Sequence, residues 1–322
     1  MSNFFQIRKS QPSATEVHVD RPLTNLSQAW FQDPANFGSD SLFPVVNVSK
    51  KSDQYFNFSR ADLMRSDADR RAIGAAANKS GFSVSTASFE CIRDSIAFGI
   101  PDGLRENADA GLSIDRAAAD YVSSQIQLVK EVRFAATAFV TGVWNASGTP
   151  GTTWDDAASD PIADVQTRQR TMMTNTGRAG NVMAIGLKVF HDLCRHPDIL
   201  DRIKYMGGPV DPALVSLQAL AAVFGVSEVR VLTASRNTAA EGAAGVYALV
   251  NNTRHALLLH RPSAPGLMVP SAGYTFVWQG GVTNKRWRDE EVESDIIEGN
   301  IWYTHVITSS VLGEMFINAV AA

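Results

Sequence analysis

Residues 154–165 read WDDAASDPIADV, residues 181–193 read NVMAIGLKVFHDL, and residues 196–204 read HPDILDRIK. Asp160 followed by Pro161 is typical of a helix start, with Asp as the N-cap and Pro at the first helical position. Residues 181–185 predict a short strand, and His196-Pro197-Asp198 predicts the start of another helix. These stretches therefore predict a dense alternation of helix and strand in the middle of the chain.

Further elements follow this region. We expect a helix from Asp211-Pro212 to Gly225, and a strand over 227–233. Residues 246–250 and 256–260, joined through Asn251-Asn252, suggest a hairpin. Another strand is expected at 274–279, and the apolar segments 301–307 and 311–317 look buried.

The strongest helix signal precedes the central region, at residues 113–141. Apolar residues recur there at helical spacing, Ser113 is a plausible N-cap and Gly142 can end the helix. A helix of this length is well above the mean of about eleven residues. It indicates an elongated structural element.

Two alternating, strand-like segments frame a charged stretch, which we call the excursion (residues 50–79). The excursion has seven cations and four anions, and a two-stranded structure of this kind is not stable alone in water. Before it, residues 1–41 contain Pro12, Pro22 and Pro34 and no sustained periodicity. We therefore expect residues 1–41 to be either disordered or an extended arm that lies on another surface.

Composition excludes several classes of protein. The 322 residues are 45% hydrophobic, which is enough for a large core, and the net charge is −4. Disorder and a strongly basic nucleic-acid-binding surface are therefore excluded. The start of the chain lacks the apolar core of a secretory signal, and its apolar runs are too short to span a membrane. Cys91 and Cys194 are expected to be free thiols.

The sequence contains no residue pattern that favours an enzyme or a bound cofactor. The sequence lacks the common nucleotide-binding and hydrolase motifs. His191, Cys194 and His196 lie close together, but no second cluster completes a zinc site, and a helix ending at Cys194 with His196 capping the next helix is the simpler interpretation. The acidic run at 289–298 lacks the ligand spacing of a calcium loop, so a solvated or intersubunit-paired strand is preferred.

The stretches quoted first resemble the major capsid proteins of tailed bacteriophages of the Hong Kong 97 type. In that family a tryptophan and an S-D-P helix start precede a helix, a short strand and an H/N-P helix. The resemblance implies an α+β fold with a long spine helix. The implied segments are an N-terminal arm (1–41), an extended β-hairpin loop (42–92), a peripheral domain with the spine helix (93–153), an axial domain (154–284) and a return to the peripheral domain (285–322).

The resemblance also implies a function. The chain would be a structural subunit that self-assembles, as hexamers and pentamers, into an icosahedral or elongated head shell around double-stranded DNA. Expected partners are copies of itself, a separate scaffolding protein, a portal and a decoration protein, with packaged DNA contacted only non-specifically and no membrane. The subunit would assemble in the host cytoplasm and end in the virion. An encapsulin-like compartment shell and an unrecognised hydrolase that uses Cys194 and His191 are the alternatives.

Complementary charge predicts one intersubunit contact, between the excursion and the segment 285–298 of a neighbour. Segment 285–298 has six acids and three bases. The contact candidates are Arg60, Arg65, Arg70, Arg71 and Lys79 on one side and Glu290, Glu291, Glu293 and Asp295 on the other. Some relatives join subunits by a lysine–asparagine isopeptide bond. Lys79 with Asn300 or Asn318 could be imagined in those roles, but no motif supports the pairing.

Overall fold

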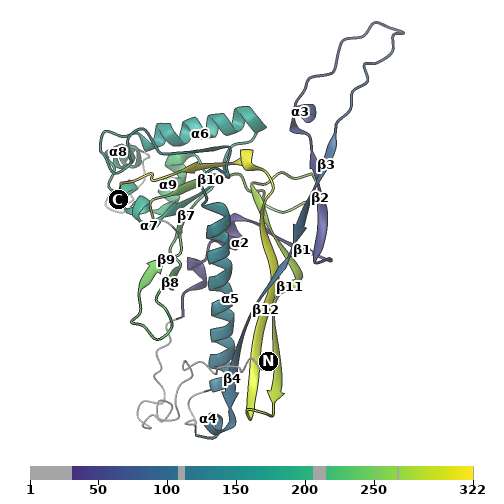
Figure 1. The fold of residues 1–322 in the computed structure, drawn as a ribbon. Coiled ribbons are helices and arrows are strands. Elements are labelled where there is room, and N and C mark those ends of the chain that lie inside the picture. The colour runs from purple at the N-terminus through teal and green to yellow at the C-terminus, as the bar shows by residue number, and fades with distance from the viewer. Residues whose placement is uncertain (1–30, 108–112, 206–214, 252, 267, 322) are drawn as a thin grey trace. The chain divides into compact units, whose positions relative to one another are not determined.

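The computed structural model describes residues 31–107, 113–205, 215–251, 253–266 and 268–321 (Figure 1). The predicted arm lies for the most part outside the described residues. Its described end forms a 3₁₀ turn, η2 (Pro34–Asn36), and a short helix, α2 (Ser39–Leu42). Among the described helices, none is both long and apolar enough to cross a membrane.

The chain divides into two compact units. The first contains Arg93–Val129 and Gly281–Ile301, and the second contains Pro34–Ile92, Lys130–Gly280 and the segment that begins at Trp302. Helix α5 (Ile114–Ala138) and strands β11 (Gly273–Asp289) and β12 (Ser294–Ile307) each contribute residues to both units. The two units are defined by which residues lie close together in space. The five predicted segments are defined by the capsid resemblance and stay a prediction.

The second unit is built around a five-stranded sheet with the order β5-β13-β10-β6-β7. The strands are β5 (Ala146–Gly148), β6 (Val182–Gly186), β7 (Glu228–Leu232), β10 (Ala256–Leu259) and β13 (Gly313–Phe316), which follows the 3₁₀ turn η3 (Ser310–Leu312). All residues of β6, β10 and β13 are buried. Trp154 and Phe316 pack together in its apolar core.

Four helices accompany this sheet, and their ends follow the sequence signals. They are α6 (Pro161–Thr176), α7 (Leu187–Leu193), α8 (Pro197–Tyr205) and α9 (Leu217–Phe224). The Asp160 side chain caps α6 by accepting from the Ala163 amide at 2.8 Å. Helix α9 ends at Gly225, whose φ of 67° favours glycine. The predicted helix start at Asp211-Pro212 lies outside the described residues, and the described helix begins after the cap Ser216.

The predicted long helix is confirmed as α5, which has 25 residues and is about 37 Å long at 1.5 Å per residue. It ends three residues before the predicted position. In the first unit, Ala118 packs with Ile100 and Ile297, and Gly299 of β12 lies against Val122. A Cβ at Gly299 would stand 2.3 Å from Val122 Cγ1, so the close approach requires glycine.

Strands β11 and β12 belong to a second sheet with the order β1-β11-β12-β4. Strand β1 (Val45–Val48) pairs in parallel with β11, and β4 (Ile92–Pro101) leads into α4 (Asp102–Glu106). The sequence predicted only residues 274–279 of β11. The missed part, residues 280–289, is charged and largely exposed, so it shows no alternation of apolar and polar residues.

The first predicted strand-like segment forms two strands, β1 and β2 (Ser52–Phe58), and the second forms β3 (Val84–Glu90). Strands β2 and β3 pair antiparallel. A short helix, α3 (Arg60–Leu63), follows β2, and the chain then forms a long loop back to β3 (Figure 1). One face of this hairpin packs on the second unit's aromatic cluster, where Phe89 stacks on Phe276 with ring centroids 4.3 Å apart.

The predicted hairpin of 246–250 with 256–260 is wrong. Strand β9 (Tyr247–Leu249) pairs with β8 (Ser235–Asn237), whereas β10 lies between β6 and β13. The physical reason is burial: all four residues of β10 are apolar and buried, so this strand takes a central place in the sheet, while β9 is mostly exposed. Cys91 and Cys194 are both free thiols, as predicted.

Candidate functional site

The excursion presents its cations on the surface. Arg60, Arg65, Arg70, Arg71 and Lys79 are all exposed. Arg65 lies 3.7 Å from Asp62, and Arg71 donates to the Ala75 carbonyl oxygen at 3.2 Å. In the described part of the chain, Arg60, Arg70 and Lys79 have no ion-pair partner.

Two acids of the excursion, Asp62 and Asp67, accept hydrogen bonds from serines near the other end of the long loop. Asp62 accepts from the amide and the hydroxyl of Ser83, at 3.0 and 2.6 Å, which joins the two ends of the long loop. These hydrogen bonds hold the pKa of Asp62 down to about 2. Asp67 accepts from the Ser80 hydroxyl. The free charge that remains on the excursion is therefore mainly positive.

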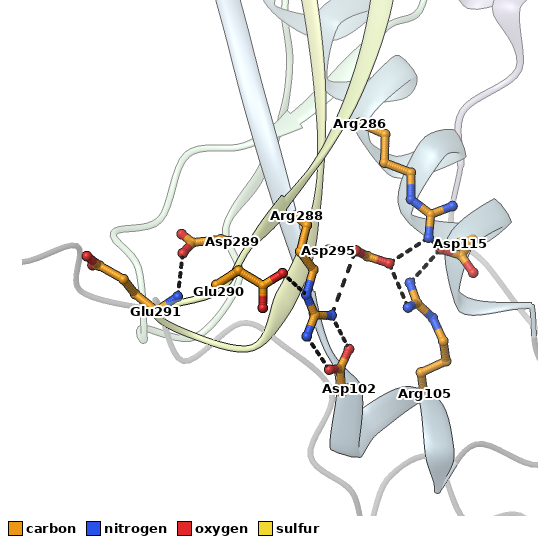
Figure 2. Close-up of polar contacts among 9 residues, drawn as sticks. All are labelled: Asp102, Arg105, Asp115, Arg286, Arg288, Asp289, Glu290, Glu291 and Asp295. Carbon is orange, nitrogen blue, oxygen red and sulfur yellow. Dashed lines mark hydrogen bonds and ion pairs between the residues drawn. The ribbon is translucent and has the colours of Figure 1, made fainter.

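The acidic segment 285–298 forms the end of the β11–β12 hairpin in the first unit. Figure 2 shows that part of this segment is already paired within the chain. Asp295 accepts from Arg105 at 2.7 Å and from Arg286 at 2.6 Å, and its side chain is only 15% exposed. Hydrogen bonds from Arg286 and Arg105 lower the pKa of Asp295. Asp295 is thus the least available of the four predicted acidic contacts.

A second pair fixes the hairpin to α4. Arg288 donates to both carboxylate oxygens of Asp102 at 2.5 Å, and this pairing lowers the pKa of Asp102 (Figure 2). The Asp102 amide also donates to the Glu293 carbonyl oxygen at 3.0 Å. Such a bidentate pair gives geometric specificity as well as attraction. The turn between β11 and β12 is therefore held in a defined position in this unit.

The other three predicted acidic contacts lie on this turn. Glu290, Glu291 and Glu293 are exposed; Glu290 lies 3.5 Å from Arg288, and the Glu291 amide donates to Asp289 at 3.1 Å. The imagined cross-link partner Asn300 is 2% exposed and bonded to Thr283, so its side chain is inaccessible to Lys79 of another subunit. Asn318 is half-buried.

The residues of the central motif have structural roles. Trp154 is fully buried and donates from Nε1 to Asp164 at 2.9 Å. Ser159 donates to the Asp156 carbonyl oxygen at 2.7 Å and lies 3.1 Å from His196 Nε2. Because the single hydroxyl hydrogen of Ser159 is already donated, His196 Nε2 is the donor to Ser159. The motif therefore joins the start of α6 to the start of α8.

This geometry changes the interpretation of the histidine–cysteine cluster. Helix α7 ends before Cys194, as expected, and His196 directly precedes α8, where its carbonyl oxygen accepts from the Leu200 amide at 3.1 Å. The His196 ring bonds to the turn before α6. Burial raises the pKa of Cys194, which disfavours a reactive thiolate. Across the described residues, no group of three or more His, Cys, Asp or Glu side chains is placed to hold a metal ion.

Sequence patterns missed two buried charges in the second unit. Glu131 of α5 is fully buried, and burial raises its pKa. Glu314 of β13 is also fully buried, and burial raises its pKa to about 7. Their partners lie far away in the sequence, so no local pattern could have identified either group.

Solved structures define the class of fold. The chain is similar to a phage-related protein from Bordetella bronchiseptica RB50, with a TM-score of 0.68 and 21% identity, covering 94% of this chain and 97% of that chain. It is also similar to the mature capsid of bacteriophage PhiM1, with a TM-score of 0.58 and 10% identity. This match covers 95% of this chain and 98% of the PhiM1 chain. The chain has the Hong Kong 97-type capsid fold, as the resemblance implied.

A curated relative agrees with this class. The major capsid protein of Burkholderia phage BcepMu is 27% identical over 218 residues, which cover 66% of this chain and 68% of the relative. No protein-family model matches the sequence. Together with the fold, this homologue identifies a phage capsid shell subunit, a structural protein and not an enzyme. The hydrolase alternative is therefore set aside.

Proposed function

We propose that this chain builds the head shell of a tailed phage as hexamers and pentamers that enclose double-stranded DNA. A scaffolding protein, a portal and a decoration protein are the further partners in this proposal, and assembly takes place in the host cytoplasm. The five predicted segments, from the arm (1–41) to the return segment (285–322), are the domain assignment that we propose with it.

The observation that carries the proposal is the exposed outer face of the β2–β3 hairpin. Side chains of Tyr55 and Phe89 point to one face and contact Phe276. The opposite face carries Phe56, which is 64% exposed, and Val84, which is 45% exposed. An apolar hairpin face of this kind is a site for another protein surface. A second copy of the chain is the occupant that a capsid subunit offers.

Opposite charges indicate which segments of two neighbouring copies would meet. Arg60, Arg70 and Lys79, which have no ion-pair partner among the described residues, extend the hairpin with cations, and the turn at the end of the β11–β12 hairpin carries the exposed acids Glu290, Glu291 and Glu293. We propose that Arg60, Arg65, Arg70, Arg71 and Lys79 of one copy lie near Glu290, Glu291 and Glu293 of a neighbour, with Asp295 in a lesser role because it is paired in its own chain. Complementary potentials of this kind improve register and association rate more than affinity.

Electron microscopy of the purified protein tests the shell. Closed particles, hexamers or pentamers are expected under conditions that favour association. Protein that stays monomeric at all salt concentrations and pH values, alone and with its scaffolding protein, would contradict the proposal. Neighbouring genes for a portal and a terminase would distinguish a phage head from an encapsulin-like compartment, which would come with a cargo enzyme instead.

The charged contact is tested by reversing it. Arg70→Glu with Arg71→Glu should reduce shell yield and leave the subunit folded, because both side chains are exposed in the subunit. Adding Glu290→Lys with Glu291→Lys should restore yield if the two sites meet. Particle yield is measured by sedimentation and folding by circular dichroism. The matched control is Arg116→Glu with Arg170→Glu, which reverses two exposed or half-exposed cations outside the excursion. Unchanged yield in the first variant would refute the charged contact.

A further inference from the structure

The segment that joins the N-terminal residues to the body is held by a buried charged group. We call residues 36–41 the latch. Both oxygens of the Glu131 carboxylate are used there: one accepts from the amides of Gly38 and Ser39 at 3.0 and 2.9 Å, and the other accepts from Asn251 Nδ2 at 3.2 Å. Glu131 is fully buried in the second unit.

Further polar contacts surround this carboxylate. Lys130, which is 8% exposed, pairs with Asp40 at 2.5 Å, and its carbonyl oxygen lies 3.3 Å from His305 Nε2. Arg230 donates to the Ser41 hydroxyl at 2.8 Å, and Arg261 donates to the Ser41 carbonyl oxygen. Thr233 donates to the Asn36 side chain at 2.9 Å. Hydrogen bonds and ion pairs from four parts of the second unit therefore converge on six residues.

The kind of contact changes abruptly after the latch. Leu42 and Phe43 are fully buried in an apolar cluster, where Phe43 lies edge-on to Phe134 with ring centroids 5.1 Å apart. Helix α2, which contains half of the latch, has only four residues and cannot be stable by itself. The latch thus depends on polar contacts, and the apolar anchor begins where it ends.

We propose that the latch opens as a local unit about Leu42 and Phe43, and that Glu131 is the positioning residue that keeps it closed. Opening would remove the two amide donors of the latch, those of Gly38 and Ser39, from a buried carboxylate, and an unsatisfied buried charge is costly. The latch is therefore closed in most subunits, and its opening uncovers Leu232, which lies against Gly38, but leaves Leu42 and Phe43 in the apolar cluster. Its use during shell assembly rests on the proposed function, whereas opening itself is a property of one subunit.

Amide hydrogen exchange of the unassembled full-length subunit tests this inference. The reporting amides are those of Ser41, Leu42 and Phe43, which donate to the carbonyl oxygens of Gly38 and Ser39. Glu131→Ala should accelerate their exchange by at least about tenfold, because the buried acceptor is lost. The amides of β10 should keep their wild-type rates.

Two matched variants separate the latch from a general loss of stability. In Glu131→Gln the remaining oxygen can accept from the amides of Gly38 and Ser39, and a turned Asn251 amide can accept from the new NH₂ group. This variant should exchange within about threefold of wild type. Glu314→Gln changes an equally buried carboxylate that does not contact the latch, so it should leave the exchange of residues 41–43 unchanged.

Two outcomes would overturn the inference. One is unchanged exchange at residues 41–43 in Glu131→Ala, and the other is exchange of these amides only together with those of β10. If Glu131→Ala does not fold, Asp40→Asn decides, because its side chain is 57% exposed and its loss removes only the pair with Lys130. Selective acceleration at 41–43 is expected there, and its absence would also overturn the inference. Because the subunit is unassembled, failure to form shells would bear only on the proposed function.

Discussion

Glu314 is a carboxylate without solvent exposure and with one weak partner. Arg168 donates to it at 3.3 Å, and the other carboxylate oxygen has no hydrogen-bond partner among the described residues. The strands on either side, β5 and β10, contribute no charged side chain. Burial therefore dominates over the attraction of Arg168 and raises the pKa of Glu314 to about 7.

This raised pKa predicts a pH dependence of stability. The folded protein binds a proton more tightly than the unfolded chain, so the free energy of unfolding should fall as pH rises from about 4.5 to about 7. The contribution is roughly 2–4 kcal/mol. Glu314→Gln should lose this part of the dependence and be more stable than wild type above pH 7. Urea unfolding of wild type and Glu314→Gln at several pH values measures the free energy of unfolding.

The matched control is Glu290→Gln, because Glu290 is exposed on the β11–β12 turn. Its pH profile should follow that of wild type. Glu131 also has a raised pKa and acts with the same sign, so the comparison is the difference between each variant and wild type. A Glu314→Gln profile parallel to wild type from pH 4.5 to pH 8 would show that Glu314 is not protonated in this range.

At the scale of elements, Ser159 and His196 connect two helix starts that lie 37 residues apart. Both side chains are nearly fully buried. Ser159→Ala and His196→Ala should each destabilise the fold, by about 1 and about 2–3 kcal/mol. The double variant should lose less than the sum, with a coupling of about 0.5–1.5 kcal/mol, because each single change removes the same hydrogen bond. Urea unfolding of the four proteins gives the coupling, and additive losses would contradict the direct bond.

Local signals predicted those elements whose ends are fixed by local chemistry. Asp160-Pro161 begins α6 and Gly225 ends α9 because capping and a left-handed residue act within a few residues. Strand β10 was assigned to the wrong partner because a strand buried on both faces has no periodicity that identifies its neighbours. Glu131 was missed as a site because its backbone partners are 92 and 93 residues away. Long-range polar contacts of this kind leave no trace in one sequence.

At the scale of the whole molecule, charge is unevenly divided along the chain. Residues 93–129 and 281–301 contain six Lys and Arg and twelve Asp and Glu, a net charge of −6. The net charge is +2 over the segments of the second unit, which contain twenty Lys and Arg and eighteen Asp and Glu in residues 34–92, 130–280 and 302–322. Copies of one chain can thus offer each other opposite charges although the whole subunit is nearly neutral.

This division predicts a salt-sensitive association. The initial rate of particle formation should fall at least about fivefold between about 0.05 and about 0.5 M NaCl, because salt screens attraction between exposed charges. Light scattering follows the rate. The variant with Arg70→Glu and Arg71→Glu should start slower and lose most of the salt dependence. A wild-type rate that rises steadily with salt would indicate that apolar contacts, and not opposite charges, guide the encounter.

The aromatic cluster beneath the β2–β3 hairpin has an optical consequence. Trp278 and Trp302 meet there with ring centroids 5.2 Å apart, and Lys51, at the start of the hairpin, lies 5.4 Å from the Trp302 ring. Indole emission responds to a neighbouring ammonium group and to entering water. Two of the six tryptophans of each subunit therefore lie at the point where the hairpin leaves the body, and movement of that hairpin in solution should change the part of the indole emission that these two contribute.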